Sequence, residues 1–354
     1  MVQPIQPHAV RQRLPSVDVV RVLAILGIIA IHTTPFENAG SPIGTRFDLA
    51  TVLNQATRFA VPFFLVVSGF FWSRKVAEAK EVRGPTVALV RRALLVWLAW
   101  WLVYLLPVNL FDALAQGALG PIKVVWWNVA LVFKRPAIAL LEGTSPHLWF
   151  LVALSFCAGV SAVFVQLGAP WALGLLAAAL YAVGLAGQSY PSAPFGFHID
   201  PSFRNGHLFS LAFFATGAWL QRRGATAAWL PAGVVLAVAG FALHLFEVGL
   251  SHRLWGTRLE RDYVAGTYLF GVGVALVALA GTRALEWRAV AALGPWVLGI
   301  YASHMVFVGL LKPLDRQLTG APWWEVAYLV VVFALALGLT RLLARSRRTR
   351  PLVS

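Results

Sequence analysis

The sequence predicts an all-α integral membrane protein, a bundle of about ten transmembrane helices with both termini in the cytoplasm. Three observations support this prediction. Of the 354 residues, 59% are hydrophobic and 12% charged, whereas soluble domains are roughly 45–50% apolar and about 25% charged. Apolar runs of about 20 residues, the length that crosses a bilayer as a helix, recur along the chain. Lysines and arginines gather in alternate connections, as they do in cytoplasmic loops.

Ten apolar runs are separated by prolines, glycines and clusters of charge. We expect transmembrane helices at residues 17–34, 54–73, 86–106, 147–166, 170–187, 206–221, 226–248, 263–281, 289–311 and 325–343. No other stretch is long enough to form a separate soluble domain. The chain is therefore divided into a cytoplasmic segment at 1–16, a transmembrane domain at 17–343 and a basic cytoplasmic tail at 344–354.

The first run follows a segment that carries Arg11 and Arg13 but no small-residue cleavage signature, so it is predicted to be an uncleaved anchor. The longest connection, 107–146, contains Trp126 and Trp127. It is predicted to hold a short interfacial helix or a re-entrant segment rather than a folded module. No internal repeat relates the runs to one another.

The orientation follows from the placement of Lys and Arg. With a cytoplasmic N-terminus, the inside segments contain 17 of the 29 basic residues and 3 of the 14 acidic ones. The outside connections contain 11 basic and 10 acidic residues, and the pair Asp18 and Arg21 cancels. The net charge of +15 therefore indicates the sidedness of a membrane protein, and nucleic acid is not expected as a partner.

Cysteine and metal chemistry are limited by composition. Cys157 is the single cysteine of the chain, which excludes an intrachain disulfide and a cysteine-based zinc site. The histidines on separate runs show no H-E-x-x-H spacing and no paired acids. We therefore predict no metal and no tightly bound cofactor.

The first run carries three polar residues, Asp18, Arg21 and His32. The eleven steps from Arg21 to His32 turn a helix by about 1,100°, only about 20° beyond three full turns, so both side chains share one face. They are separated by roughly 16 Å along the axis. An ionisable residue inside a membrane costs about 2.5–3.5 kcal/mol, which favours a functional role. Alternatively, Arg21 snorkels to the headgroups with Asp18 as its partner, and His32 lies at the outer interface.

Other runs place polar groups where a cavity in the outer half of the bundle is expected. These groups are Arg58, Ser68, His147 with its neighbour Trp149, Tyr301 and His304. Singly, each has an ordinary structural explanation, such as close helix packing, an interfacial aromatic belt or a packed tyrosine. Together, they favour one shared site.

The motifs resemble those of the membrane acyltransferase-3 family. Arg21 and His32 form an Arg-x10-His pattern, which is followed in order by RFAVPFFLVVSGFFW, HLWFLVAL and IYASHMVF. The resemblance covers nearly the whole chain. It implies transfer of an acyl group, usually acetyl, from cytoplasmic acyl-CoA to a surface or exported polysaccharide or its lipid-linked oligosaccharide precursor. It also implies a bacterial inner-membrane location, contact with membrane lipids, and partners among the polysaccharide assembly or export proteins.

The resemblance implies roles for individual residues. His32 is expected to act as the catalytic base or as an acyl carrier, since an imidazole accepts a proton near neutral pH. Arg21 is expected to contact the acyl-CoA co-substrate or to order the polar stripe through Asp18. Arg58 or Tyr301 is expected to stabilise the oxyanion. The remaining candidates are expected to contact donor or acceptor, the acceptor sugar above all: Ser68, His147, Trp149 and His304.

Two other functions stay open at this point. A transporter or flippase of a glycan or lipid-linked intermediate also places charges inside the membrane, but it is expected to show repeat symmetry or broken helices in corresponding halves. An acetyltransferase with a small-molecule acceptor keeps the chemistry and changes the substrate. The cytoplasmic arginines suit CoA phosphates, although the ordinary charge bias of membrane proteins explains most of them.

Overall fold

The computed structural model describes residues 14–36, 48–199, 207–319 and 321–353, and all regular structure in those ranges is helical. Most of the N-terminal segment predicted at 1–16 lies outside the described residues. The chain is a multi-pass membrane protein, since eight helical segments within the described ranges are long and apolar enough to cross a bilayer.

Every predicted span overlaps one main helix, although the spans predicted at 54–73 and 289–311 also include shorter helical segments that precede it. The main helices are α1 (Pro15–Thr33), α3 (Ala60–Ala79), α4 (Arg83–Val103), α8 (Trp149–Gln166), α9 (Pro170–Gly184), α10 (His207–Arg223), α11 (Trp229–Trp255), α12 (Ala265–Leu279), α14 (Val297–Leu318) and α15 (Pro322–Ala344). α12 is apolar but has only 15 residues, and α10 is also absent from the eight segments that meet the length and hydropathy criteria. The count of ten membrane crossings thus stays a prediction.

Shorter helices extend or connect the main ones. α2 (Leu49–Ala56) and a 3-10 turn at Thr57–Phe59 lead directly into α3, and a π-helical turn at Leu185–Ser189 ends α9. α13 (Arg288–Ala291) and a 3-10 turn at Gly294–Trp296 precede α14.

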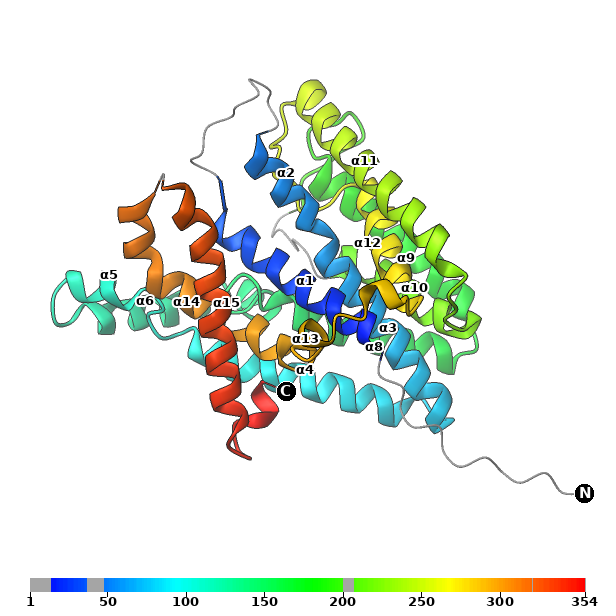
Figure 1. Cartoon of the computed structure of the whole chain (residues 1–354), viewed down its shortest axis with the longest axis horizontal. Helices are drawn as coiled ribbons and strands as arrows, with labels where there is room; N and C mark the ends of the chain where they lie inside the picture. Colours follow the sequence, from blue (N-terminus) through cyan, green and yellow to red (C-terminus); the bar gives the residue numbers. More distant parts are fainter. Residues whose placement is uncertain (1–13, 37–47, 200–206, 320, 354) are drawn as a thin grey trace, which may run out of the picture.

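The long connection at 107–146 folds as α5 (Leu110–Ala115), α6 (Gly120–Lys134) and α7 (Pro136–Leu141). α5 and α6 project from one edge of the molecule (Figure 1). The side chains of Trp126 and Trp127 on α6 are exposed. α6 spans roughly 22 Å at 1.5 Å per residue, less than the hydrocarbon thickness of about 30 Å. These dimensions are compatible with the predicted interfacial or re-entrant placement, which remains a prediction.

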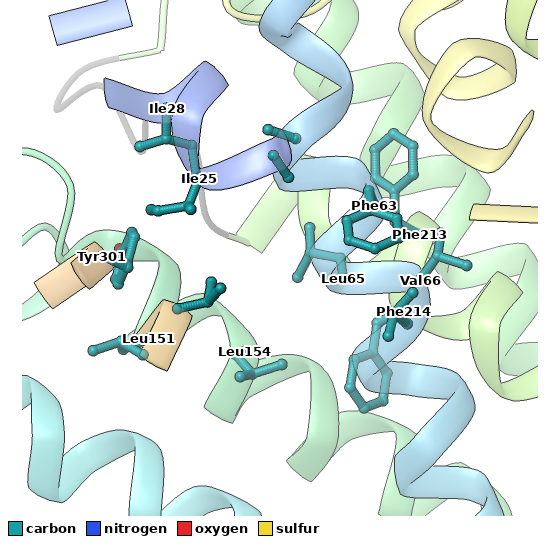
Figure 2. Close-up of a cluster of buried hydrophobic side chains, with 14 of the residues drawn as sticks. Ile25, Ile28, Phe63, Leu65, Val66, Leu151, Leu154, Phe213, Phe214 and Tyr301 are labelled. Atoms are coloured by element: carbon teal, nitrogen blue, oxygen red, sulfur yellow. The ribbon is translucent and has the colours of Figure 1, made fainter. Parts of the chain in front are cut away.

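α1 occupies the centre of the molecule (Figure 1), where it contacts α3 and α12 on one side and α14 and α15 on the other. A larger share of it is buried than of any other of the eight candidate spans. Figure 2 shows Ile25 and Ile28 of α1 in the buried apolar cluster, with Tyr301 of α14 nearby. Polar side chains on α1 therefore face protein rather than lipid.

The C-terminal tail folds back onto the bundle through a 3-10 turn at Arg350–Leu352. The indole nitrogen of Trp100 on α4 donates a hydrogen bond to the carbonyl of Leu352 (3.1 Å), and Val353 is fully buried. The described part of the predicted basic tail is therefore docked at its end, while the side chains at 345–348 are exposed.

Candidate functional site

Two cavities lie along α1, and we name them by their chemistry. The histidine cavity, of about 450 Å³, is lined by His32, Arg58, His147, Trp149 and Tyr301 among others. The arginine cavity, of about 300 Å³, is lined by Arg21, Ser68, Arg92 and Tyr301 among others. Most of the residues singled out in the sequence thus lie in one or both of two adjoining spaces.

The helical period of α1 explains how one helix serves both cavities. Arg21 and Ile28 line the arginine cavity, and Ile28 and His32 line the histidine cavity. Steps of seven and four residues keep these side chains on one face of a helix. The spacing of Arg21 and His32 therefore predicts the arrangement that the structure has.

Asp18 and Arg21 form an ion pair, with Arg21 Nη1 at 3.0 Å from Asp18 Oδ1. The Asp18 side chain is almost fully buried, and the Arg21 guanidinium also lies 5.6 Å from the centre of the Phe71 ring. Gly294 makes room for the pair, since a Cβ atom at this position would lie 2.6 Å from Asp18 Cγ. A buried carboxylate needs such a partner, so Asp18 is suited to hold the Arg21 side chain in place.

The ring of His304 on α14 contacts the ring of His32 on α1 and the ring of His147, which directly precedes α8. The ring of His304 lies 5.3 Å from that of His32 and 4.9 Å from that of His147, measured between centroids. His304 Nδ1 lies 2.6 Å from the carbonyl oxygen of Tyr301, to which it donates, which leaves Nε2 as an acceptor. Nε2 is buried and has no hydrogen-bond partner among the described residues.

His147 and Tyr301 hold each other in position. The Tyr301 hydroxyl donates to the carbonyl of His147. His147 Nδ1 lies 3.0 Å from Ser145 Oγ, and its Nε2 lies 3.4 Å from the carbonyl of Ala302. The Tyr301 hydroxyl is therefore already engaged, and the oxyanion role expected of it would require that bond to break.

Arg58 enters the histidine cavity from the turn between α2 and α3. Its Nε and Nη2 donate to Asn54 Oδ1 at 3.1 and 2.7 Å, and its Nη1 donates to Asp262 Oδ1 at 2.8 Å. The Arg58 side chain is largely buried. A guanidinium held on two sides by acceptors is preorganised, as a stabiliser of developing negative charge needs to be.

The rim of the histidine cavity carries charges of both signs. Glu142, Arg258, Glu260 and Asp262 all line it, together with the aromatic rings of Trp149 and Tyr263. Such a lining suits a polar acceptor with hydroxyl or charged groups. No group of three or more His, Cys, Asp or Glu side chains in the described part of the chain has the geometry of a metal site.

Two placements differ from the expectation of a single site in the outer half of the bundle. Ser68 lies in the arginine cavity with Arg21 rather than near His32, because it shares an α3 face with Phe64 and Val61. His304, expected to contact the acceptor sugar, is fully buried and lines neither cavity. It packs behind His32 and His147, where it can act on substrates only through those rings.

Sequence reasoning did not single out Asn54, His244, Phe150 and Asp262. His244 lies within the apolar helix α11 and is fully buried. A histidine inside an apolar run is the sequence signal that drew attention to His32, and the same signal applies to His244. Asn54 precedes Arg58 by four residues, a spacing that brings side chains together on a helix. Asp262 lies 204 residues from Arg58 in the sequence, so only the tertiary structure reveals that pair.

Comparison with known proteins gives the family. A family described as an acyltransferase domain, Acyl_transf_3, matches residues 14–341. This chain belongs to the acyltransferase-3 family. The predicted resemblance to this family is thereby confirmed.

The individual proteins to which the chain is similar are distant relatives. An amino-acid racemase of Enterococcus faecalis is 29% identical over 220 residues, which cover 58% of this chain and 28% of the relative. A serine/alanine racemase of Enterococcus gallinarum is 26% identical over 221 residues, which cover 59% and 29%. The match to this acyltransferase-3 protein thus spans less than a third of the length of these relatives. No solved structure matches the chain significantly.

Proposed function

We propose that this acyltransferase-3 protein moves an acetyl or other short acyl group from cytoplasmic acyl-CoA to a hydroxyl of a surface or exported polysaccharide or its lipid-linked precursor. The observation that carries the proposal is the meeting of two chemically different cavities along α1. One contains arginines suited to an anionic donor, and the other contains an imidazole and a mixed-charge rim suited to a polar acceptor.

The proposal includes ten spans in the bacterial inner membrane, with both termini in the cytoplasm. In this orientation the inside segments have a large excess of basic residues and the outside connections are nearly neutral. Arg21 then lies in the cytoplasmic half of α1, and His32 in the outer half. The donor therefore approaches from the side on which acyl-CoA is made.

On the donor side, Arg21 and Arg92 both line the arginine cavity. Guanidinium groups bind phosphate oxygens and carbonyls through paired N–H donors. In the proposed complex these arginines hold the pantetheine or phosphate groups of acyl-CoA, and the thioester points along α1 towards Ile28. Ser68 lines the same cavity and contacts the donor.

On the acceptor side, His32 accepts the proton of the attacking hydroxyl. The hydroxyl oxygen forms a bond to the thioester carbonyl carbon, the carbon–sulfur bond breaks, and CoA leaves as a thiol after taking up a proton. Arg58 stabilises the negative charge that develops on the carbonyl oxygen. Transfer through an acyl-His32 intermediate uses the same residues and has the same overall balance.

The function is tested by replacing the base. We expect His32→Ala to lower acylation by about 10²–10⁴-fold, the usual contribution of a positioned general base. The measurement is mass spectrometry of acyl groups released by mild base from surface polysaccharide, at matched levels of membrane-inserted protein. His207→Ala is the control, since His207 lies on α10 and lines neither cavity.

Full acylation in the His32→Ala cells would remove His32 from the mechanism. Identical glycans with and without the wild-type protein would contradict the polysaccharide acceptor.

A second candidate acceptor is a small amino acid. The relatives are named as amino-acid and serine/alanine racemases, and the carboxylates and arginines at the rim of the histidine cavity complement a zwitterion. In this case the product is an N- or O-acylated amino acid. Mass spectrometry of small molecules from the same cells distinguishes this acceptor from a polysaccharide.

A further inference from the structure

The histidine and arginine cavities share part of their lining. Ile28, Val61, Phe150 and Tyr301 line both spaces, and they come from four different helices, α1, α3, α8 and α14. We call these four residues the shared wall. Ile28 and Tyr301, both labelled in Figure 2, represent α1 and α14 in it.

The shared wall is apolar and packed. The Phe150 ring meets the Tyr301 ring edge-on, with centroids 5.7 Å apart, and lies 6.2 Å from the ring of Phe64. Ile28 and Tyr301 are both less than a tenth exposed. The hydroxyl of Tyr301 is bonded to the backbone of His147, which fixes this ring, whereas Phe150 is held by packing alone.

Under the proposed function, the acyl group has to pass the shared wall. The thioester arrives beside Arg21 in the arginine cavity, and His32 lies in the histidine cavity. The charged part of CoA stays with the arginines, so only the acyl carbon and its substituent need to cross. A close-packed apolar constriction resists added volume, and one extra methylene changes specificity by about 10–200-fold in such a site.

We propose that the shared wall is a constriction that selects the acyl group, and that Phe150 limits the transferred group to the size of acetyl. This inference rests on the proposed acyl transfer and adds the residues that set its donor specificity. Phe150 is the principal determinant of acyl-group size because, of the side chains in the shared wall, it is the largest that no hydrogen bond holds in place. Its loss would join the two cavities and leave room for propionyl and butyryl groups.

The experiment is a competition between donors. Membranes are prepared from cells that contain the wild-type protein or a variant, under conditions in which acyl transfer by the wild-type protein is measured. These membranes receive an equal mixture of acetyl-CoA, propionyl-CoA and butyryl-CoA. Acyl groups bound to the acceptor are then released by mild base and counted by mass spectrometry. The ratio of acetyl to butyryl product is an internal measure, so the amount of folded protein does not affect it.

We expect Phe150→Ala to lower the acetyl-to-butyryl ratio by at least about 10-fold. Val61→Ala, on a different helix, is expected to lower it in the same direction and guards against a variant that fails to fold. Leu154→Ala is the matched control, because Leu154 lines the arginine cavity and does not belong to the shared wall. It is expected to leave the ratio unchanged.

An unchanged ratio in both wall variants would overturn the constriction while leaving acyl transfer intact. An equal fall in the Leu154→Ala membranes would overturn it too, because the ratio would then report general loosening of the donor cavity. A wild-type protein that transfers no acyl group from any donor would overturn the proposed function itself.

Discussion

At the scale of single residues, Arg58 shows how a charge is held inside the bundle. Behind it lies His244, whose Nδ1 is 2.9 Å from Thr267 Oγ1 and whose Nε2 is 2.7 Å from Gln55 Oε1. The Gln55 amide donates to Asn54, the residue that accepts from Arg58. If the side-chain amide of Gln55 is rotated by 180°, it keeps its hydrogen bond to His244 Nε2. It then also bonds the backbone N–H and carbonyl of Arg261, the residue next to Asp262. Either orientation ties His244 to the groups that hold Arg58.

We therefore expect His244→Phe to impair acyl transfer although His244 touches neither cavity. A buried Gln55 without its partner costs about 1–3 kcal/mol of stability, and the Arg58 guanidinium loses its fixed orientation. The expected result is a fall of roughly 10-fold in transfer per folded molecule, with a lower unfolding temperature in detergent. His207→Phe serves as the comparison, and equal behaviour of the two variants would show that His244 has no special role.

At the scale of elements, close helix pairs depend on glycines. A Cβ atom at Gly69 of α3 would collide with the carbonyl of Phe214, and one at Gly217 of α10 would collide with the carbonyl of Val66. The two glycines thus let α3 and α10 approach backbone to backbone, as small residues do in membrane helix pairs. Close helix packing, the ordinary explanation considered for Ser68, is therefore the role of its neighbour Gly69, while Ser68 lines the arginine cavity.

This contact gives a prediction about stability. Gly217→Ala should destabilise the protein by about 1–3 kcal/mol, since the added methyl group forces α3 and α10 apart. Gly159→Ala is the matched control in α8, where a Cβ atom meets nothing within 4 Å, and alanine is the better helix former. The measurement is the unfolding temperature of both variants in one detergent. A Gly217→Ala protein as stable as the control would contradict the close approach of the two helices.

At the scale of the whole molecule, the direction of transfer depends on orientation in the membrane. The charge asymmetry of the connections predicts that the tail is cytoplasmic and that the connection between α11 and α12 is external. Both regions offer exposed reporter positions, Ser346 and Arg258. Cys157 is the only cysteine of the chain and is fully buried. Replacing it with alanine gives a cysteine-free protein, the background into which single reporter cysteines are introduced.

In that background, we expect a membrane-impermeant maleimide to label Arg258→Cys in intact cells. Ser346→Cys should react only after the cells are permeabilised. The physical reason is the excess of basic residues retained on the cytoplasmic side. The opposite labelling pattern would reverse the orientation and would place the arginine cavity on the wrong side for cytoplasmic acyl-CoA.

The sequence by itself determined the helical membrane architecture, the family and the common face of Arg21 and His32. These features depend on the length of apolar runs and on the helical period, which are local properties of the chain. The tertiary structure alone decided that Asp262 pairs with Arg58, that His304 packs behind the other histidines and that Phe150 lines both cavities. These contacts join helices far apart in sequence, and their geometry follows from how whole helices pack, which no local pattern encodes.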